Sequence, residues 1–294
     1  MTFHKGQTAL VVFCITLVLT LYFWGKRTGN APATDNSMPA AGMPAAMADS
    51  LPQAAKTQLN IAQLAQNMKA KLSKTGADSI AYWEKQVQTS PDAIAKARAL
   101  KEIARLWEKE RYVELSAYYY HLMAQADSTR NNWLEAANRQ ADAFQIAADS
   151  TMRMYLIENA IDAYEKTLRF DTSQTEVKVN LANCYFDGYP NMPPMVMKGV
   201  MMLREVTAKD STNVGANLSL GRMSIMSGQF DKAVNRFQTV LRKDAANAEA
   251  YYYLGEAYAA MGQKEKAREA FENCKKLVKN PTFATQLDEY IKKL

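Results

Sequence analysis

Apolar residues recur at intervals of three and four residues from about Leu59 to the C-terminus, and no stretch there alternates strictly between apolar and polar residues. This spacing places apolar side chains on one face of an α-helix, whereas strict alternation is typical of a β-strand. Glycine and proline are sparse, at 12 and 9 of 294 residues, which also favours long helices over a turn-rich β fold. The sequence therefore predicts an all-α fold for this part of the chain.

One helical pattern occurs twice near the C-terminus. LGRMSIMSGQFDKAVNRF runs from Leu220 to Phe237, and LGEAYAAMGQKEKAREAF runs from Leu254 to Phe271, so equivalent residues are separated by one constant interval. Small side chains at fixed positions allow two helices to approach closely, and aromatic rings fill the hollows between neighbouring hairpins. The two copies share Leu220, Gly221, Ala233 and Phe237 in the first and Leu254, Gly255, Ala267 and Phe271 in the second.

This pattern resembles the tetratricopeptide repeat, a helix-turn-helix unit of about 34 residues. The resemblance assigns Tyr251 and Tyr258 to the aromatic positions of repeat 248–281, and it gives the shared Leu, Gly, Ala and Phe positions their role in the contact between helices. The resemblance implies a right-handed solenoid over 97–281, with repeats at 97–130, 131–174, 175–213, 214–247 and 248–281. Repeat 214–247 has Asn217 and Ser224 where aromatic residues usually stand, so we expect it to pack more loosely against repeat 175–213. Repeat 131–174 is longer than the usual unit, which predicts a stretched first helix. The prolines of GYPNMPP (188–194) predict a protruding loop, because proline disrupts a helix interior.

Capping helices are expected at both ends of the solenoid, over 56–96 and 282–294, because terminal repeats need a polar outer face. Apolar residues recur along the second of these segments, and Asn280-Pro281 precedes it as a helix start.

The N-terminal region, 1–27, has the features of a membrane anchor. Residues 8–25 carry no charge and would span about 27 Å as a helix, close to the thickness of a bilayer core. Bulky Tyr22 and Trp24 end the run, which favours a single transmembrane signal-anchor in contact with lipid over a cleaved signal peptide. Residues 28–55, rich in Ala, Pro and Met, predict a flexible linker.

The side of the membrane is less clear. Lys26 and Arg27 weakly favour a cytoplasmic location for the residues that follow, whereas the short N-terminal tail suits a bacterial anchor that exports them. We expect the bulk of the chain to be periplasmic, and a cytoplasmic location stays open.

The distribution of charge and the lack of catalytic motifs argue against a nucleic-acid-binding protein and against an enzyme. The 36 basic and 30 acidic residues are mixed along the chain, so no basic tract for nucleic acid stands out. No phosphate-binding loop, nucleophile motif or paired-cysteine site occurs, and His121 has no partner at relay spacing. We therefore expect neither an enzyme nor a bound cofactor.

Such a solenoid implies a concave groove lined by the first helix of each repeat, where a protein or peptide partner can bind. The second, fifth, ninth and twelfth positions of the repeats face this groove. The candidate groove residues are Arg98, Lys101, Arg105, Asn183, Phe186, Leu218, Arg222, Ile225, Tyr252 and Glu256. The chain resembles single-anchor tetratricopeptide proteins of bacterial inner membranes, which implies a membrane-anchored scaffold or adaptor. The sequence identifies neither the partner nor the oligomeric state.

An alternative function uses methionine. Met192, Met195 and Met197 lie in or beside the predicted loop, and thioether sulfur is a soft ligand suited to Cu(I). Against this, methionine is also an adaptable filler of apolar space, and the chain contains 16 of them. No histidine or cysteine lies beside these methionines to add a further ligand. A Cu(I)-binding, metal-handling protein is therefore the second functional hypothesis, after the scaffold.

Overall fold

The computed structural model describes residues 60–294, which lie in a compact unit formed by Thr57–Leu294. This part of the chain contains thirteen helices and no strand, in agreement with the predicted all-α class. The predicted anchor and linker fall outside the described residues. Among the helices at 60–294, none has both the length and the apolar character needed to cross a bilayer.

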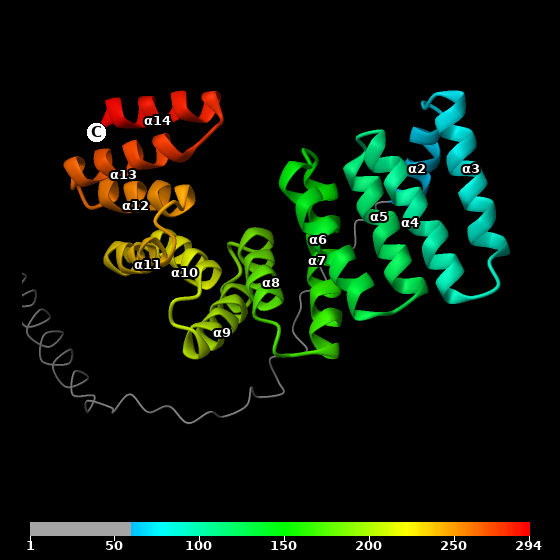
Figure 1. Cartoon of the computed structure of the whole chain (residues 1–294), viewed down its shortest axis with the longest axis horizontal. Coiled ribbons are helices and arrows are strands. Elements are labelled where there is room, and N and C mark those ends of the chain that lie inside the picture. The colour runs from blue at the N-terminus through cyan, green and yellow to red at the C-terminus, as the bar shows by residue number, and fades with distance from the viewer. Residues whose placement is uncertain (1–59) are drawn as a thin grey trace, which may run out of the picture. The chain divides into compact units, whose positions relative to one another are not determined.

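The helices follow one another along the chain with short connections (Figure 1). Their bounds are α2 Ile61–Lys69, α3 Lys74–Thr89, α4 Ala93–Lys109, α5 Val113–Ala126, α6 Arg130–Ile146, α7 Ser150–Phe170, α8 Thr175–Gly188, α9 Pro193–Lys209, α10 Val214–Met226, α11 Phe230–Lys243, α12 Ala248–Ala260, α13 Lys264–Leu277 and α14 Pro281–Lys293.

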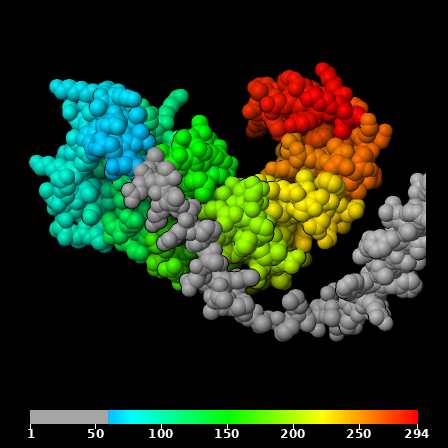
Figure 2. Space-filling view, turned by 180° about the vertical axis from the view of Figure 1, so that it is seen from behind, coloured from blue at the N-terminus to red at the C-terminus, as the bar shows by residue number. Residues whose placement is uncertain are grey.

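Each helix packs mainly on its neighbours in sequence, which is the arrangement of a helix-hairpin solenoid. The pairs α4–α5, α6–α7, α8–α9, α10–α11 and α12–α13 form hairpins, and the second helix of each contacts the first helix of the next. Figure 2 shows the same order, because each coloured segment touches those next to it along the colour scale.

Local sequence explains where the last two hairpins begin and turn. Asn213 and Asn247, at equivalent positions of the two hairpins, each accept a hydrogen bond from the backbone N–H three residues later, at 2.9 Å. These bonds satisfy an N–H group that the first helical turn leaves without a partner. Gly228 and Gly262 lie between the two helices of their hairpins with φ of 71° and 72°, a conformation that glycine adopts without strain.

Glycine and phenylalanine hold these two hairpins together. A Cβ atom added to Gly221 would lie 2.5 Å from Phe237 Cε1, and one added to Gly255 would lie 2.6 Å from Phe271 Cε1. Both phenylalanine rings are buried. The two helices of each hairpin therefore approach closely at the glycine, because only a hydrogen in place of a side chain leaves room for the ring.

The third hairpin uses the same contact in reverse. Here the glycine is on the second helix and the ring is on the first, since a Cβ on Gly199 of α9 would lie 2.5 Å from Phe186 of α8. Phe186 is only 4% exposed and packs with Leu203 and Val206 of α9. The prediction that Phe186 faces a groove is therefore wrong, because its ring fills the inside of the hairpin.

Two length predictions are refined by the structure. In repeat 131–174 both helices are longer than their equivalents in the next hairpin but one, with 17 residues in α6 and 21 in α7 against 13 in α10 and 14 in α11, whereas a longer helix was predicted for the first position alone. The loop predicted at 188–194 is shorter, because Gly188 ends α8 and Pro193 and Pro194 form the first turn of α9. Proline fits there because a first-turn residue needs no intrahelical N–H bond.

Candidate functional site: a polar cleft between helices α6 and α8

Charged residues link the first helices of successive hairpins. Lys101 of α4 binds Glu135 of α6 at 2.5 Å, and Arg139 of α6 binds Glu108 of α4 at 2.7 Å. Further along, Arg222 of α10 binds a carboxylate of α8 at 3.1 Å. The first helices of the hairpins thus share one face, which we call the A-helix face.

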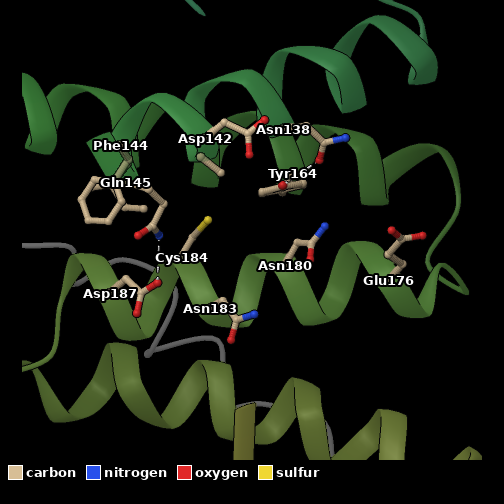
Figure 3. A pocket seen from close by; sticks show the side chains of 12 residues that line it. Asn138, Asp142, Phe144, Gln145, Tyr164, Glu176, Asn180, Asn183, Cys184 and Asp187 are labelled. Carbon is tan, nitrogen blue, oxygen red and sulfur yellow. Dashed lines mark hydrogen bonds between the residues drawn. The ribbon is translucent and has the colours of Figure 1, made fainter. Parts of the chain in front are cut away.

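Between α6 and α8 this face opens into a cleft of about 400 Å³. Figure 3 shows side chains from α6 and from α8 pointing toward one another across it, with Tyr164 of α7 and Cys184 of α8 between them. The lining residues are Asn138, Ala141, Asp142, Phe144, Gln145, Ile157, Tyr164, Glu176, Asn180, Asn183, Cys184 and Asp187.

The lining is acidic. It contains three carboxylates, Asp142, Glu176 and Asp187, and no lysine or arginine. Only Asp187 is neutralised by an ion pair within residues 60–294, with Arg222 at 3.1 Å. The exposed carboxylates of Asp142 and Glu176 have no ion-pair partner among residues 60–294, so the cleft favours cationic groups.

The cleft is also lined by four amide side chains, those of Asn138, Gln145, Asn180 and Asn183. Asn138 accepts a 2.8 Å hydrogen bond from the Tyr164 hydroxyl, and Gln145 donates to Asp187 at 3.4 Å across the cleft. Asn183 Oδ1 is shielded from solvent and has no hydrogen-bond partner among the described residues. An amide group offers both donors and an acceptor, as the backbone of an extended peptide does. The cleft can therefore hold a peptide main chain by amide contacts.

Two titratable groups at the base of the cleft are neutral at physiological pH. Burial, and then the nearby Asp187, raise the pKa of the Cys184 thiol to about 12. Burial also raises the pKa of the Tyr164 hydroxyl. Because the thiolate is the reactive form of cysteine, Cys184 acts here as a buried apolar side chain.

The predicted groove residues are distributed over the whole A-helix face. Arg98 and Arg105 are exposed on α4, and Arg105 pairs with Glu102 of the same helix at 2.7 Å. Lys101, bound to Glu135, lies beside them, and of the predicted residues only Asn183 lines the cleft.

The remaining predicted residues are engaged within the protein. Leu218 and Ile225 are partly buried against a core cluster formed mainly by α11 and α12. Tyr252 donates a 2.8 Å hydrogen bond to Glu256 and packs against Phe283 of α14. Much of the surface of these three side chains, Leu218, Ile225 and Tyr252, is therefore in contact with other parts of the protein and not with a partner.

The lining residues outside the predicted set come from α6, α7 and α8. Asp142 is the twelfth residue of repeat 131–174, and applying the groove positions to that repeat would have identified it. Asn138 and Asn180 lie at other positions and line the cleft because of the spacing between α6 and α8.

The three methionines do not form one site. Met195 is 4% exposed in the core, whereas Met197, on the same helix, is 53% exposed. Residues 60–294 also contain no group of three His, Cys, Asp or Glu side chains placed to hold a metal ion.

Comparison with known proteins agrees with this fold. Residues 224–273 match the family model of the tetratricopeptide repeat. TTC0263, a tetratricopeptide-repeat protein of Thermus thermophilus, is 11% identical over 66% of this chain and 97% of its own, with a TM-score of 0.51. The comparison with curated proteins gave no match.

Two further solved structures are similar at lower TM-scores. YrrB, described as a tetratricopeptide-repeat protein with an unusual peptide-binding site, is 20% identical over 72% of this chain and 98% of its own, with a TM-score of 0.45. MamA of Desulfovibrio magneticus RS-1 is 14% identical over 62% and 94%, with a TM-score of 0.47. Residues 224–273 are thus tetratricopeptide repeat, and residues 60–294 form a helix-hairpin solenoid of that type.

Proposed function

We propose that this protein is a membrane-anchored scaffold that binds an extended segment of another protein on its A-helix face. The bound segment carries lysine or arginine and lies in the α6–α8 cleft. The observation that carries this proposal is the lining of the cleft, where four amides accompany three carboxylates and no cation.

The amides and the carboxylates have different roles in this function. Asn180 of α8 and Gln145 of α6 bind the main chain of the partner, whatever its sequence. Asp142 and Glu176 select for cationic side chains, because neither carboxylate has an ion pair within the described residues.

The anchor is the second part of the proposal. The uncharged run at 8–25 supports a single-pass segment, and the linker at 28–55 would tether the solenoid to the membrane. We propose that the solenoid lies on the periplasmic side. Protease added to spheroplasts then digests residues 60–294, and digestion only after lysis would place them in the cytoplasm.

Peptide selection tests the binding site. Random peptides of about 12 residues, long enough to cross one cleft when extended, are selected on the full chain in mild detergent. We expect enrichment of lysine and arginine. Replacing both free carboxylates, in Asp142→Asn with Glu176→Gln, should raise the Kd of an enriched peptide about fivefold, since exposed ion pairs contribute about 0.2–1 kcal/mol each.

A matched control uses Glu265→Gln with Glu269→Gln, two exposed carboxylates on α13. This variant has the same net charge as the cleft variant and should bind like the unmodified chain. An equal loss in both variants would show that overall charge, and not the cleft, attracts the peptide.

A further inference from the structure

A second groove lies between α9, α10 and α11, away from the acidic cleft. Its volume is about 590 Å³. Apolar side chains from two hairpins form part of its wall, namely Val196, Val200, Leu220 and Met223. This groove is thus an apolar recess on the side of the molecule where the second helices α9 and α11 lie.

The groove exists because a small residue replaces an aromatic one. Ser224 lines it, and its hydroxyl turns back to donate a 2.9 Å hydrogen bond to the Leu220 carbonyl. The equivalent residue in the next hairpin is Tyr258. That ring packs against the core between α11 and α12, and its hydroxyl accepts a 3.2 Å hydrogen bond from Gln238. The expected looser packing at Ser224 is therefore an open recess.

The charge of this groove is opposite to that of the cleft. Arg204, Lys232 and Arg236 line it, and no aspartate or glutamate does. Within residues 60–294 none of these three cations takes part in an ion pair. Arg222, by contrast, binds Asp187. The three groove cations are available to an anionic ligand.

The guanidinium of Arg236 is hydrogen-bonded to a neutral side chain, that of Asn217, and not to a carboxylate. Its Nη1 donates a 2.9 Å hydrogen bond to Asn217 Oδ1. Asn217 is 1% exposed, and its amide nitrogen is fixed by hydrogen bonds to the carbonyls of Ser211 and Asn213. Partial burial, and then Arg204, lower the pKa of Arg236. A partly desolvated guanidinium without a carboxylate gains from binding one.

We propose that the α9–α11 groove is a second docking site, and that its occupant is an amphipathic segment of another protein that carries carboxylates. Its apolar side chains cover Val196, Val200 and Met223, and its carboxylates bind Arg204, Lys232 and Arg236. Met197, 53% exposed in the wall of the groove, adds an adaptable apolar surface.

The shape of the groove favours a peptide over an anionic membrane surface. The apolar residues line a recess between helices, which a narrow segment can enter. A flat bilayer would reach the exposed side chains, such as Arg204 and Lys232, and would leave the recess empty. The inference does not depend on the proposed function, because the two sites have opposite charge and separate linings.

The test fills the groove with a tyrosine ring at position 224, where the next hairpin has Tyr258 at the equivalent position. Random peptides of about 16 residues, long enough for a few helical turns, are displayed and selected on the full chain in mild detergent. We expect a class rich in Asp or Glu together with Leu, Met or Phe. The variant Ser224→Tyr should weaken binding of a synthesised member of this class at least about tenfold, measured by fluorescence polarisation.

Charge reversal gives an independent variant if the added ring disturbs folding. Arg204→Glu with Lys232→Glu should also weaken binding about tenfold. Lys264→Glu with Arg268→Glu changes the net charge equally on exposed positions of α13 and should stay within about twofold of the unmodified chain. Asp142→Asn with Glu176→Gln, which tests the α6–α8 cleft, should leave this binding unchanged.

Three outcomes would overturn the proposal. The first is that no acidic, apolar class of peptide is selected. The second is that such peptides bind the unmodified chain and the Ser224→Tyr and charge-reversal variants equally. The third is that vesicles of equal parts phosphatidylcholine and phosphatidylglycerol lose binding in the charge-reversal variant while the peptides do not, which would assign the three cations to a membrane surface.

Discussion

Adding one methyl group at Gly221 tests the packing on which the hairpins depend. The new Cβ of Gly221→Ala would lie 2.5, 2.6 and 3.1 Å from three carbon atoms of the Phe237 ring. That ring is 0% exposed, so it has no free space into which to move. The methyl group therefore forces the ring, or the α10 backbone, out of its position.

Two effects of opposite sign determine the result. Overpacking a core costs about 1–3 kcal/mol. Alanine in a helix interior is favoured over glycine by about 1 kcal/mol, which offsets part of that cost. We expect Gly221→Ala to lower the free energy of unfolding by about 1 kcal/mol, which corresponds to a Tm decrease of about 2–4 °C.

Urea denaturation followed by circular dichroism measures this change, and a second background identifies its cause. In a Phe237→Leu chain the smaller side chain leaves room for the methyl group. There Gly221→Ala should become stabilising by about 0.5–1 kcal/mol, because only the helix propensity remains. Gly76→Ala is the control, since the nearest neighbour of its Cβ would be the Ser73 hydroxyl oxygen, at 3.3 Å, and not a buried ring.

A change of sign between the two backgrounds is the decisive result. If Gly221→Ala is equally destabilising in the Phe237→Leu background, the ring is not what excludes a side chain at position 221. If it stabilises the unmodified chain, the two helices are not in close contact there.

Three further predictions concern single groups. Burial lowers the pKa of His121 below its usual value, so the unfolded chain binds more protons than the folded chain. The free energy of unfolding should therefore fall as the pH drops through about 6.5. Urea midpoints at several pH values should show this fall for the unmodified chain and a weaker pH dependence for His121→Gln. Cys184, with a pKa of about 12, should carry on the order of a thousandfold less thiolate at pH 8 than a free thiol, so iodoacetamide, followed by peptide mass spectrometry, should modify it only after unfolding. Arg222→Met should free the Asp187 carboxylate and lower the Kd of a cationic cleft peptide about threefold, and a higher Kd would show that Asp187 does not attract the ligand.

The repeated spacing, together with the resemblance to the tetratricopeptide repeat, predicted the close helix contacts of the last two hairpins. Gly221, Phe237 and their equivalents in the next repeat could be assigned because a close approach of two helices leaves few permitted side chains. The small residue at Ser224 also predicts looser packing, and the α9–α11 groove lies at that position.

The acidic cleft could not be predicted in the same way. Its lining depends on how far α6 lies from α8, and that spacing follows from the three-dimensional packing of α6, α7 and α8, which are far apart in the sequence at the residues concerned. Phe186 was assigned to the wrong face because the third hairpin exchanges the positions of glycine and ring. The repeat positions taken from the last two hairpins therefore do not predict which side chains face the groove in the third hairpin.

Photo-crosslinking in native membranes tests directly whether the α6–α8 cleft binds a basic segment of another protein. A benzoylphenylalanine placed at Asn180, in the cleft, is compared with one at exposed Glu272 on α13. The account predicts that only the cleft position captures a protein, that the attached peptide contains lysine or arginine, and that Asp142→Asn with Glu176→Gln lowers the yield. Equal capture at both positions, or an attached peptide without basic residues, would contradict it.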